Sequence, residues 1–171
     1  MELNNLFGLP AHPLLVHLPV VFVPMASIAA IILAIFPKYL GKFGWWVTGA
    51  SFIGMVGAVL AAGSGEELEH KVAHSATLEH HGQLGETARL LSFVLFAVML
   101  IVMLVRRYRP ALIAKKAAGI VVSVLIVAAS VAAGWAMIAT GHNGAKASWC
   151  EVSKNCPVST GTDTTGDSDE G

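Results

Sequence analysis

Charged residues are scarce in this chain. Only 13% of its 171 residues are Asp, Glu, Lys or Arg, whereas 55% are hydrophobic. A soluble domain usually carries about 25% charged residues, so water is not the main solvent of this protein. The formal net charge is zero, which argues against a nucleic-acid partner because such binding depends on an excess of Lys and Arg. The first apolar run also lacks a preceding basic stretch, so we expect no removable signal peptide.

Familiar catalytic patterns are missing as well. The chain has no C-x-x-C-H sequence for covalent haem attachment and no H-E-x-x-H sequence for a zinc hydrolase. No nucleophile with its base, phosphate-binding loop or arranged pair of carboxylates is evident either. The sequence therefore leaves open whether the protein is an enzyme.

Long apolar runs, by contrast, are abundant. A membrane-spanning helix needs about 20 mostly apolar residues, and four runs meet this need, at 14–36, 45–62, 88–105 and 117–140. Short connections make neighbouring helices antiparallel. We therefore predict an all-α integral membrane protein, an up-down four-helix transmembrane bundle over residues 13–142. A short segment, 1–12, precedes it, and a disordered acidic tail, 143–171, follows it.

The basic residues are distributed unequally between the two predicted membrane faces. Seven fall in the two loops of one face, and four fall on the other. Short loops rich in Lys and Arg stay in the cytoplasm, so we expect both termini to be extracytoplasmic, in the cell inner (plasma) membrane. The seven are Lys38, Lys42, Arg106, Arg107, Arg109, Lys115 and Lys116.

The only two cysteines, Cys150 and Cys156, both lie in the predicted outer tail. An oxidising compartment would allow them to form a disulfide. Spacing alone does not establish that pairing, so two free thiols remain the alternative.

Small residues and prolines shape the predicted helices. Pro19 and Pro24 lack the N–H that a helix interior needs, so we expect the first helix to be kinked near its outer end. Ser64 to Glu67 has the pattern of a capping box, which predicts that a short helix starts there. Two stripes of small residues are typical of helix packing faces in lipid: Ala50, Gly54, Ala58 and Ala62, and Gly119, Ser123, Ser130 and Gly134.

Histidines gather at the predicted outer face. All seven fall there, although four separate segments carry them: His12, His17, His70, His74, His80, His81 and His142. His70 and His80 stand beside glutamates and are readily explained as solvated loop residues. His17 lies about a turn inside an apolar run, where an ionisable side chain indicates a functional site.

Three functional interpretations of these histidines compete. A b-type haem would take imidazoles from two helices as axial ligands, and His17 and His81 fit best, with room beside Gly82 and Gly85. Copper or zinc would need three or four converging ligands, which His17, His74, His81 and His142 supply. A pH-sensing cluster is the third interpretation.

Three motifs resemble the bacterial membrane-protein family called domain of unknown function 2231, over residues from about 10 to 149. They are His12-Pro13-Leu14-Leu15-Val16-His17-Leu18-Pro19, Glu79-His80-His81-Gly82-Gln83-Leu84-Gly85 and Thr140-Gly141-His142-Asn143-Gly144-Ala145. The family has no established activity. The resemblance implies a site formed by His12, His17, one of the pair His80 and His81, and His142. Some relatives are joined to cytochrome-like modules, which is consistent with a redox role.

Together these patterns predict a histidine-lined site at the extracytoplasmic face that binds haem b for electron transfer, next to a redox protein or respiratory complex. His17 and His81 would form its core, and His12, His74 and His142 its rim. A copper or zinc site is the first alternative. The second is a non-catalytic accessory subunit that packs through its small-residue stripes against a larger complex. The lipid bilayer is the expected surrounding in each case, and a homo-oligomer is possible.

Overall fold

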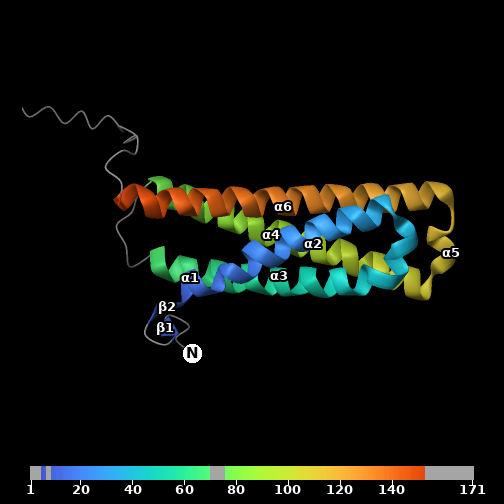
Figure 1. Ribbon diagram of the computed structural model, residues 1–171, viewed down its shortest axis with the longest axis horizontal. Coiled ribbons are helices and arrows are strands. Elements are labelled where there is room, and N and C mark those ends of the chain that lie inside the picture. The colour runs from blue at the N-terminus through green and yellow to red at the C-terminus, as the bar shows by residue number, and fades with distance from the viewer. Residues whose placement is uncertain (1–4, 7–8, 70–75, 153–171) are drawn as a thin grey trace, which may run out of the picture.

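The computed structural model describes residues 5–6, 9–69 and 76–152 and has four long helices. They run back and forth beside one another (Figure 1), and they are α2 (His17–Ile35), α3 (Leu40–Glu69), α4 (Ala76–Tyr108) and α6 (Lys116–Val152). Short elements join or precede them: a small antiparallel hairpin of β1 (Asn5–Leu6) and β2 (Leu9–Pro10), then α1 (Ala11–Leu15), the 3-10 turn η1 (Pro37–Tyr39) and α5 (Pro110–Ile113). The predicted up-down bundle is confirmed.

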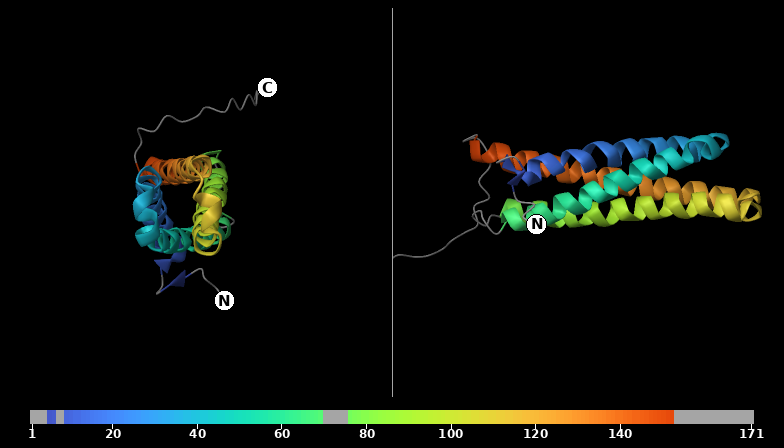
Figure 2. Two further views of the ribbon diagram at one scale, coloured as in Figure 1. Left: turned by 90° about the vertical axis from the view of Figure 1, so that its right-hand side faces the viewer. Right: turned by 90° about the horizontal axis from the view of Figure 1, so that it is seen from below.

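The four long helices form a square in cross-section (Figure 2). α2 packs against α3 and α6, and α4 packs against the same two helices, so α2 and α4 lie across the diagonal. Small and medium apolar side chains fill the centre, which lets the backbones approach closely. The most deeply buried include Val23, Ala26, Ala30, Leu95, Met99, Ile126 and Ala133.

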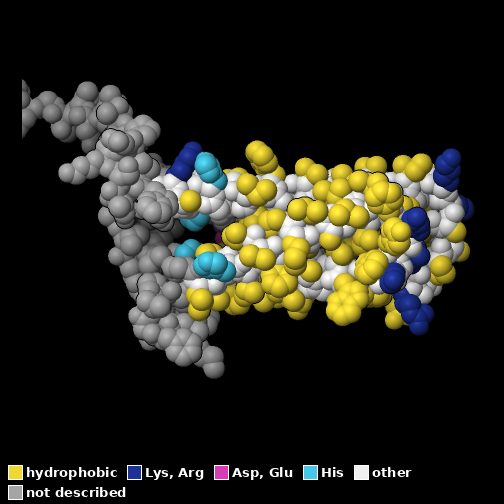
Figure 3. Space-filling view, in the orientation of Figure 1, with side chains coloured by type: hydrophobic (Ala, Val, Ile, Leu, Met, Phe, Trp, Pro, Cys, Tyr) yellow, Lys and Arg dark blue, Asp and Glu magenta, His cyan; other side chains and the backbone are white. Residues whose placement is uncertain are grey.

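All four long helices are long and apolar enough to cross a membrane. Large apolar side chains cover the outside of the bundle, among them Ile28, Leu90 and Val124, each more than half exposed. In Figure 3 apolar side chains cover most of the visible face between the two ends of the bundle. Water would solvate such a surface poorly, whereas lipid chains match it. The protein is therefore embedded in the bilayer and contacts its lipids.

The two ends of the bundle carry different side chains (Figure 3). One end, here called the basic end, consists of η1, α5 and the helix turns that flank them, and holds the seven Lys and Arg residues predicted to share one face. Exposed Tyr39, Trp46 and Tyr108 lie there too, as expected of aromatic residues at a membrane surface. The other end, the histidine end, consists of α1, the last turns of α3, the first turns of α4 and residues 140–152 of α6.

Both small-residue stripes pack against α2 inside the bundle. A Cβ atom added at Gly54 of α3 would lie 2.8 Å from Cγ2 of Val23 and 3.2 Å from the backbone nitrogen of Val23. A Cβ added at Gly134 of α6 would lie 3.4 Å from the side chain of Ser27. α2 therefore uses the packing faces that the sequence predicted.

The helix interruption expected near Pro19 lies just before it. α1 ends at Leu15 and α2 begins at His17, with a turn at Val16 between them. The amide of Val16 still donates to the carbonyl of His12 over 3.1 Å, and the amide of Val20 donates to Val16 over 3.2 Å. The backbone of Val16 stays in the helical region, so these hydrogen bonds are kept, and α2 continues through Pro24.

Two boundary predictions need correction. α3 runs unbroken through Ser64, so no new helix starts there. The hydroxyl of Ser64 donates to the carbonyl of Ala61 in the preceding turn (2.9 Å) and therefore caps no helix end. α6 reaches Val152, so the first ten residues of the predicted disordered tail are helical; no proline interrupts the chain between Pro110 and Pro157. The rest of the tail, with Cys156, lies outside the described residues, as do His70 and His74, and the side chain of Cys150 is not described.

Candidate cofactor site at the histidine end

His12 is held by the last turns of α3. Its Nδ1 lies 3.0 Å from the carbonyl oxygen of Ala61 and 3.0 Å from the hydroxyl of Ser64. A carbonyl oxygen can only accept, so Nδ1 carries the hydrogen and donates it, and Nε2 holds the lone pair. Metal-binding histidines are commonly oriented in this way, with the other ring N–H bound to a carbonyl or carboxylate. His12 therefore presents Nε2 as a ligand atom.

Gly65 of α3 has no side chain and so leaves space for the imidazole of His12. A Cβ atom added at Gly65 would lie 3.1 Å from Cε1 of His12, tighter than an ordinary van der Waals contact. The ring is half-buried against the helix backbone. Gly65 was part of the predicted capping box, and its role is instead to let α1 bring His12 onto α3.

His81 occupies the matching place on the other side of the bundle. It is half-buried on α4, and a Cβ atom added at Gly144 of α6 would lie 2.8 Å from its Cε1 and 3.4 Å from its Nε2. Its Nδ1 is buried, and among the described residues no well-formed hydrogen bond reaches this atom, although the ring also lies by the backbone of Thr140. A buried polar atom without a partner is costly and needs an explanation. A bound group would provide one.

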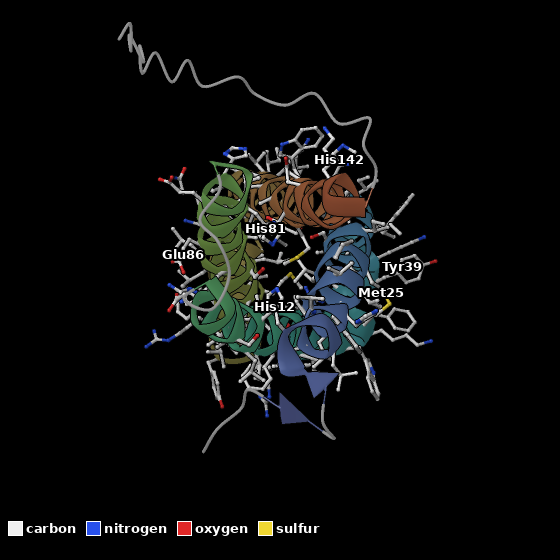
Figure 4. All side chains as sticks on the ribbon, turned by 90° about the vertical axis from the view of Figure 1, so that its left-hand side faces the viewer. His12, Met25, Tyr39, His81, Glu86 and His142 are labelled. Carbon is white, nitrogen blue, oxygen red and sulfur yellow. The ribbon has the colours of Figure 1, made fainter. Side chains whose placement is uncertain are left out.

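The two imidazoles face the interior together. Figure 4 shows His12, on α1, and His81, on α4, inside the square of helices. One turn further along α4, a Cβ atom added at Gly85 would meet nothing within 4 Å. Room therefore exists beside the face of α4 that the sequence predicted to be bare.

A hydrogen bond between helices stabilises this arrangement. The hydroxyl of Thr140 on α6 donates to the carbonyl of Leu84 on α4 (3.0 Å), and also lies 2.8 Å from the carbonyl of Ala136 in its own helix. Leu84 is three residues from His81, and Thr140 is four from Gly144. The bond thus fixes α6 against α4 where Gly144 meets His81.

The remaining predicted site residues lie differently. His17, His80 and His142 are exposed, and Figure 4 shows His142 on the outer side of the bundle. Five helical residues turn the chain by about 140° beyond a full rotation, so His12 and His17 do not share a face. From the sequence, His17 was expected in the centre and His12 on the rim, whereas His12 is the half-buried residue of the two and His17 is exposed.

The described part of the chain does not assemble a larger ligand set. Within it, no three His, Cys, Asp or Glu side chains converge closely enough to hold a metal ion. His74 lies outside the described residues, so the predicted set of His17, His74, His81 and His142 stays a prediction. What the described residues bring together is one pair of imidazoles.

Sequence reasoning missed the groups that position this pair. The carbonyl of Ala61 leaves no sequence signal, and Ser64 was assigned to a helix cap. Gly144 was visible as part of the motif that closes the last span, but its role depends on which helix it faces. The shared feature is a histidine on one helix opposite a glycine on another, Gly65 for His12 and Gly144 for His81.

Comparison with known proteins places the chain in a family. A family model described as predicted membrane protein, domain of unknown function 2231, matches residues 8–157. The match covers most of the chain, including all three motifs that suggested the resemblance, so the chain belongs to this family. No curated protein and no solved structure matches it.

Proposed function

We propose that this member of the family of domain of unknown function 2231 is a membrane protein that binds haem b through His12 and His81 at the histidine end. Haem b, when bound, supplies one-electron transfer. The observation that carries the proposal is the hydrogen bond from His12 Nδ1 to the Ala61 carbonyl, which leaves the lone pair on Nε2, while His81 lies inside the same square of helices. His12 replaces His17 in the pair expected from sequence, because His17 is exposed.

The number of enclosed imidazoles favours haem over zinc. A haem iron is held by one or two protein ligands, and facing helices of a bundle commonly provide them. A zinc site needs three or four protein ligands. His12 and His81 provide two, and the open space beside Gly85 lies one turn below His81. The buried, unpartnered Nδ1 of His81 also fits a site whose bound group orders the ring.

Copper is the second candidate. His12 and His81 provide two imidazoles inside the square of helices, and imidazole is a good ligand for copper. A small ion would need less rearrangement of this pair than a porphyrin. The accessory-subunit alternative is weaker, because α2 already occupies the small-residue stripes that would have bound another subunit.

A reduced-minus-oxidised absorption spectrum of the purified protein tests the proposal. We expect a Soret band that is lost in both His12→Ala and His81→Ala, because each substitution removes one of the two imidazoles that would hold the haem. His80→Ala is the matched control: it changes the exposed neighbour of His81 and should keep the band. A wild-type protein without the band that retains copper, and loses it in the same two variants, would support the second candidate. Retention of neither group would refute a cofactor function.

A further inference from the structure

A groove runs between α3 and α4 on the outer surface of the bundle, at the histidine end. Its volume is about 550 Å³, and it is lined by Val59, Glu86, Thr87, Arg89, Leu90 and Phe93. Figure 4 shows Glu86 on the outer side of α4, away from the histidine pair. The groove is therefore separate from the proposed cofactor site and opens toward the lipid.

Charged groups lie at one end of the groove. The guanidinium of Arg89 pairs with the carboxylate of Glu86 and lies 3.9 Å from a carboxylate oxygen of Glu66 on α3. All three side chains are at least 36% exposed. Two carboxylates and one guanidinium leave this group with one excess negative charge. A ligand that carries both a phosphate and an ammonium group would complement it.

Apolar side chains form the rest of the groove. Val59, Leu90 and Phe93 are 48%, 63% and 56% exposed and belong to the lipid-facing surface. Phe93 lies one turn further into the membrane span than Arg89. The groove thus changes from charged to apolar in the direction in which a phospholipid changes from head group to acyl chain.

We propose that this groove binds one phospholipid whose head group carries a primary ammonium. Its phosphate pairs with Arg89, its ammonium donates to Glu66 and Glu86, and an acyl chain lies along Val59, Leu90 and Phe93. A purely anionic head group is repelled by the excess negative charge of Glu66, Glu86 and Arg89. A trimethylated ammonium has no N–H to donate to a carboxylate. The two carboxylates therefore select the primary amine.

Native mass spectrometry of the detergent-solubilised protein tests this selection. Phosphatidylethanolamine, phosphatidylcholine and phosphatidylglycerol with identical acyl chains are added in turn, and the fraction of lipid-bound protein is measured. We expect phosphatidylethanolamine to bind about three- to fivefold more tightly than the other two, the ratio for one partly exposed ion pair. Glu66→Gln combined with Glu86→Gln should abolish its advantage over phosphatidylcholine. Arg89→Gln should weaken all three lipids.

Arg109→Gln is the matched control, since it removes an exposed cation next to the far end of α4 and should leave the lipid preference unchanged. Equal binding of the three lipids, or strongest binding of phosphatidylglycerol, would overturn the proposal. A protein dimer that binds no lipid and dissociates in the Arg89→Gln variant would place a second copy of the chain in the groove, and would overturn it too. None of these results depends on whether haem is bound.

Discussion

The polar side chains of the basic end and of the histidine end make different kinds of contact. At the basic end, cations lie over the rings of their own sequence neighbours: Lys38 over Tyr39, Lys42 over Phe43, and Arg107 over Tyr108. At the histidine end, the hydrogen bonds of His12 and Thr140 join residues 49 to 56 positions apart. A local pair survives many changes elsewhere. A long-range pair requires each helix to have the right rotation and depth, so substitutions at the histidine end should have more specific effects.

The largest expected difference between the two ends is the side of the membrane on which each lies, because a helix bundle inserts with one end facing the cytoplasm and the other facing away from it. We propose that the basic end faces the cytoplasm, since short loops rich in Lys and Arg are retained there. In a protein whose native cysteines are replaced by serine, a cysteine at exposed Leu112 should react with a membrane-impermeant thiol reagent only after the cells are permeabilised. A cysteine at exposed Lys146 should react in intact cells.

The opposite labelling pattern would contradict this orientation and would also place the histidine pair in the cytoplasm. Equal labelling at both positions in intact cells would indicate a mixed insertion. A variant with Lys38, Lys42, Arg106 and Arg107 changed to glutamine provides the internal check. Removal of these charges should reduce the difference between the two labelling positions.

Close packing gives the second contrast. A Cβ added at Gly44, in the basic end, would lie 2.4 Å from the Sδ of Met103, closer than any contact at Gly57. Met103 is flexible and can move, so Gly44→Ala should change the unfolding free energy by less than about 1 kcal/mol. Gly57→Ala pushes against the backbone nitrogen of Pro19 at 3.0 Å, which has no such freedom.

We therefore expect Gly57→Ala to lower the unfolding free energy by about 1–3 kcal/mol. Denaturation of both variants in the same detergent, followed by circular dichroism, measures the difference. A larger decrease in unfolding free energy for Gly44→Ala than for Gly57→Ala would contradict this expectation. It would show that the length of the shortest contact determines the destabilisation and that the flexibility of the neighbouring side chain does not.

The same contrast explains what the sequence could and could not predict. Apolar runs, the seven clustered cations and the small-residue stripes are local patterns, and they predicted the spans, the shared face of the basic loops and the packing against a neighbour. Motif spacing also drew attention to His12, His81 and Gly144. The choice between His12 and His17 depended on which side of this helical segment packs against α3, since the two rings stand about 140° apart around it. No local pattern encodes which side faces the neighbouring helix.

The smallest expected difference between the two ends concerns hydrogen bonds between helices. α6 donates one such bond toward each end of the bundle. Ser123, toward the basic end, donates to the carbonyl of Ala34 on α2 (3.1 Å), and Thr140, at the histidine end, donates to the carbonyl of Leu84 on α4 (3.0 Å). Such bonds contribute on average about 0.6 kcal/mol in a membrane protein. Ser123→Ala and Thr140→Val should therefore lower the unfolding free energy by similar, small amounts.

Only Thr140→Val should also lower the amount of haem or copper that the purified protein retains, because it loosens α6 where Gly144 lies against His81. The retained cofactor is measured per mole of protein, alongside the unfolding free energy of the same preparation. Equal loss of cofactor in Ser123→Ala would mean that retention follows overall stability, and that the contact between Gly144 and His81 has no specific role. Unchanged retention in Thr140→Val would mean that Gly144 alone keeps His81 in position.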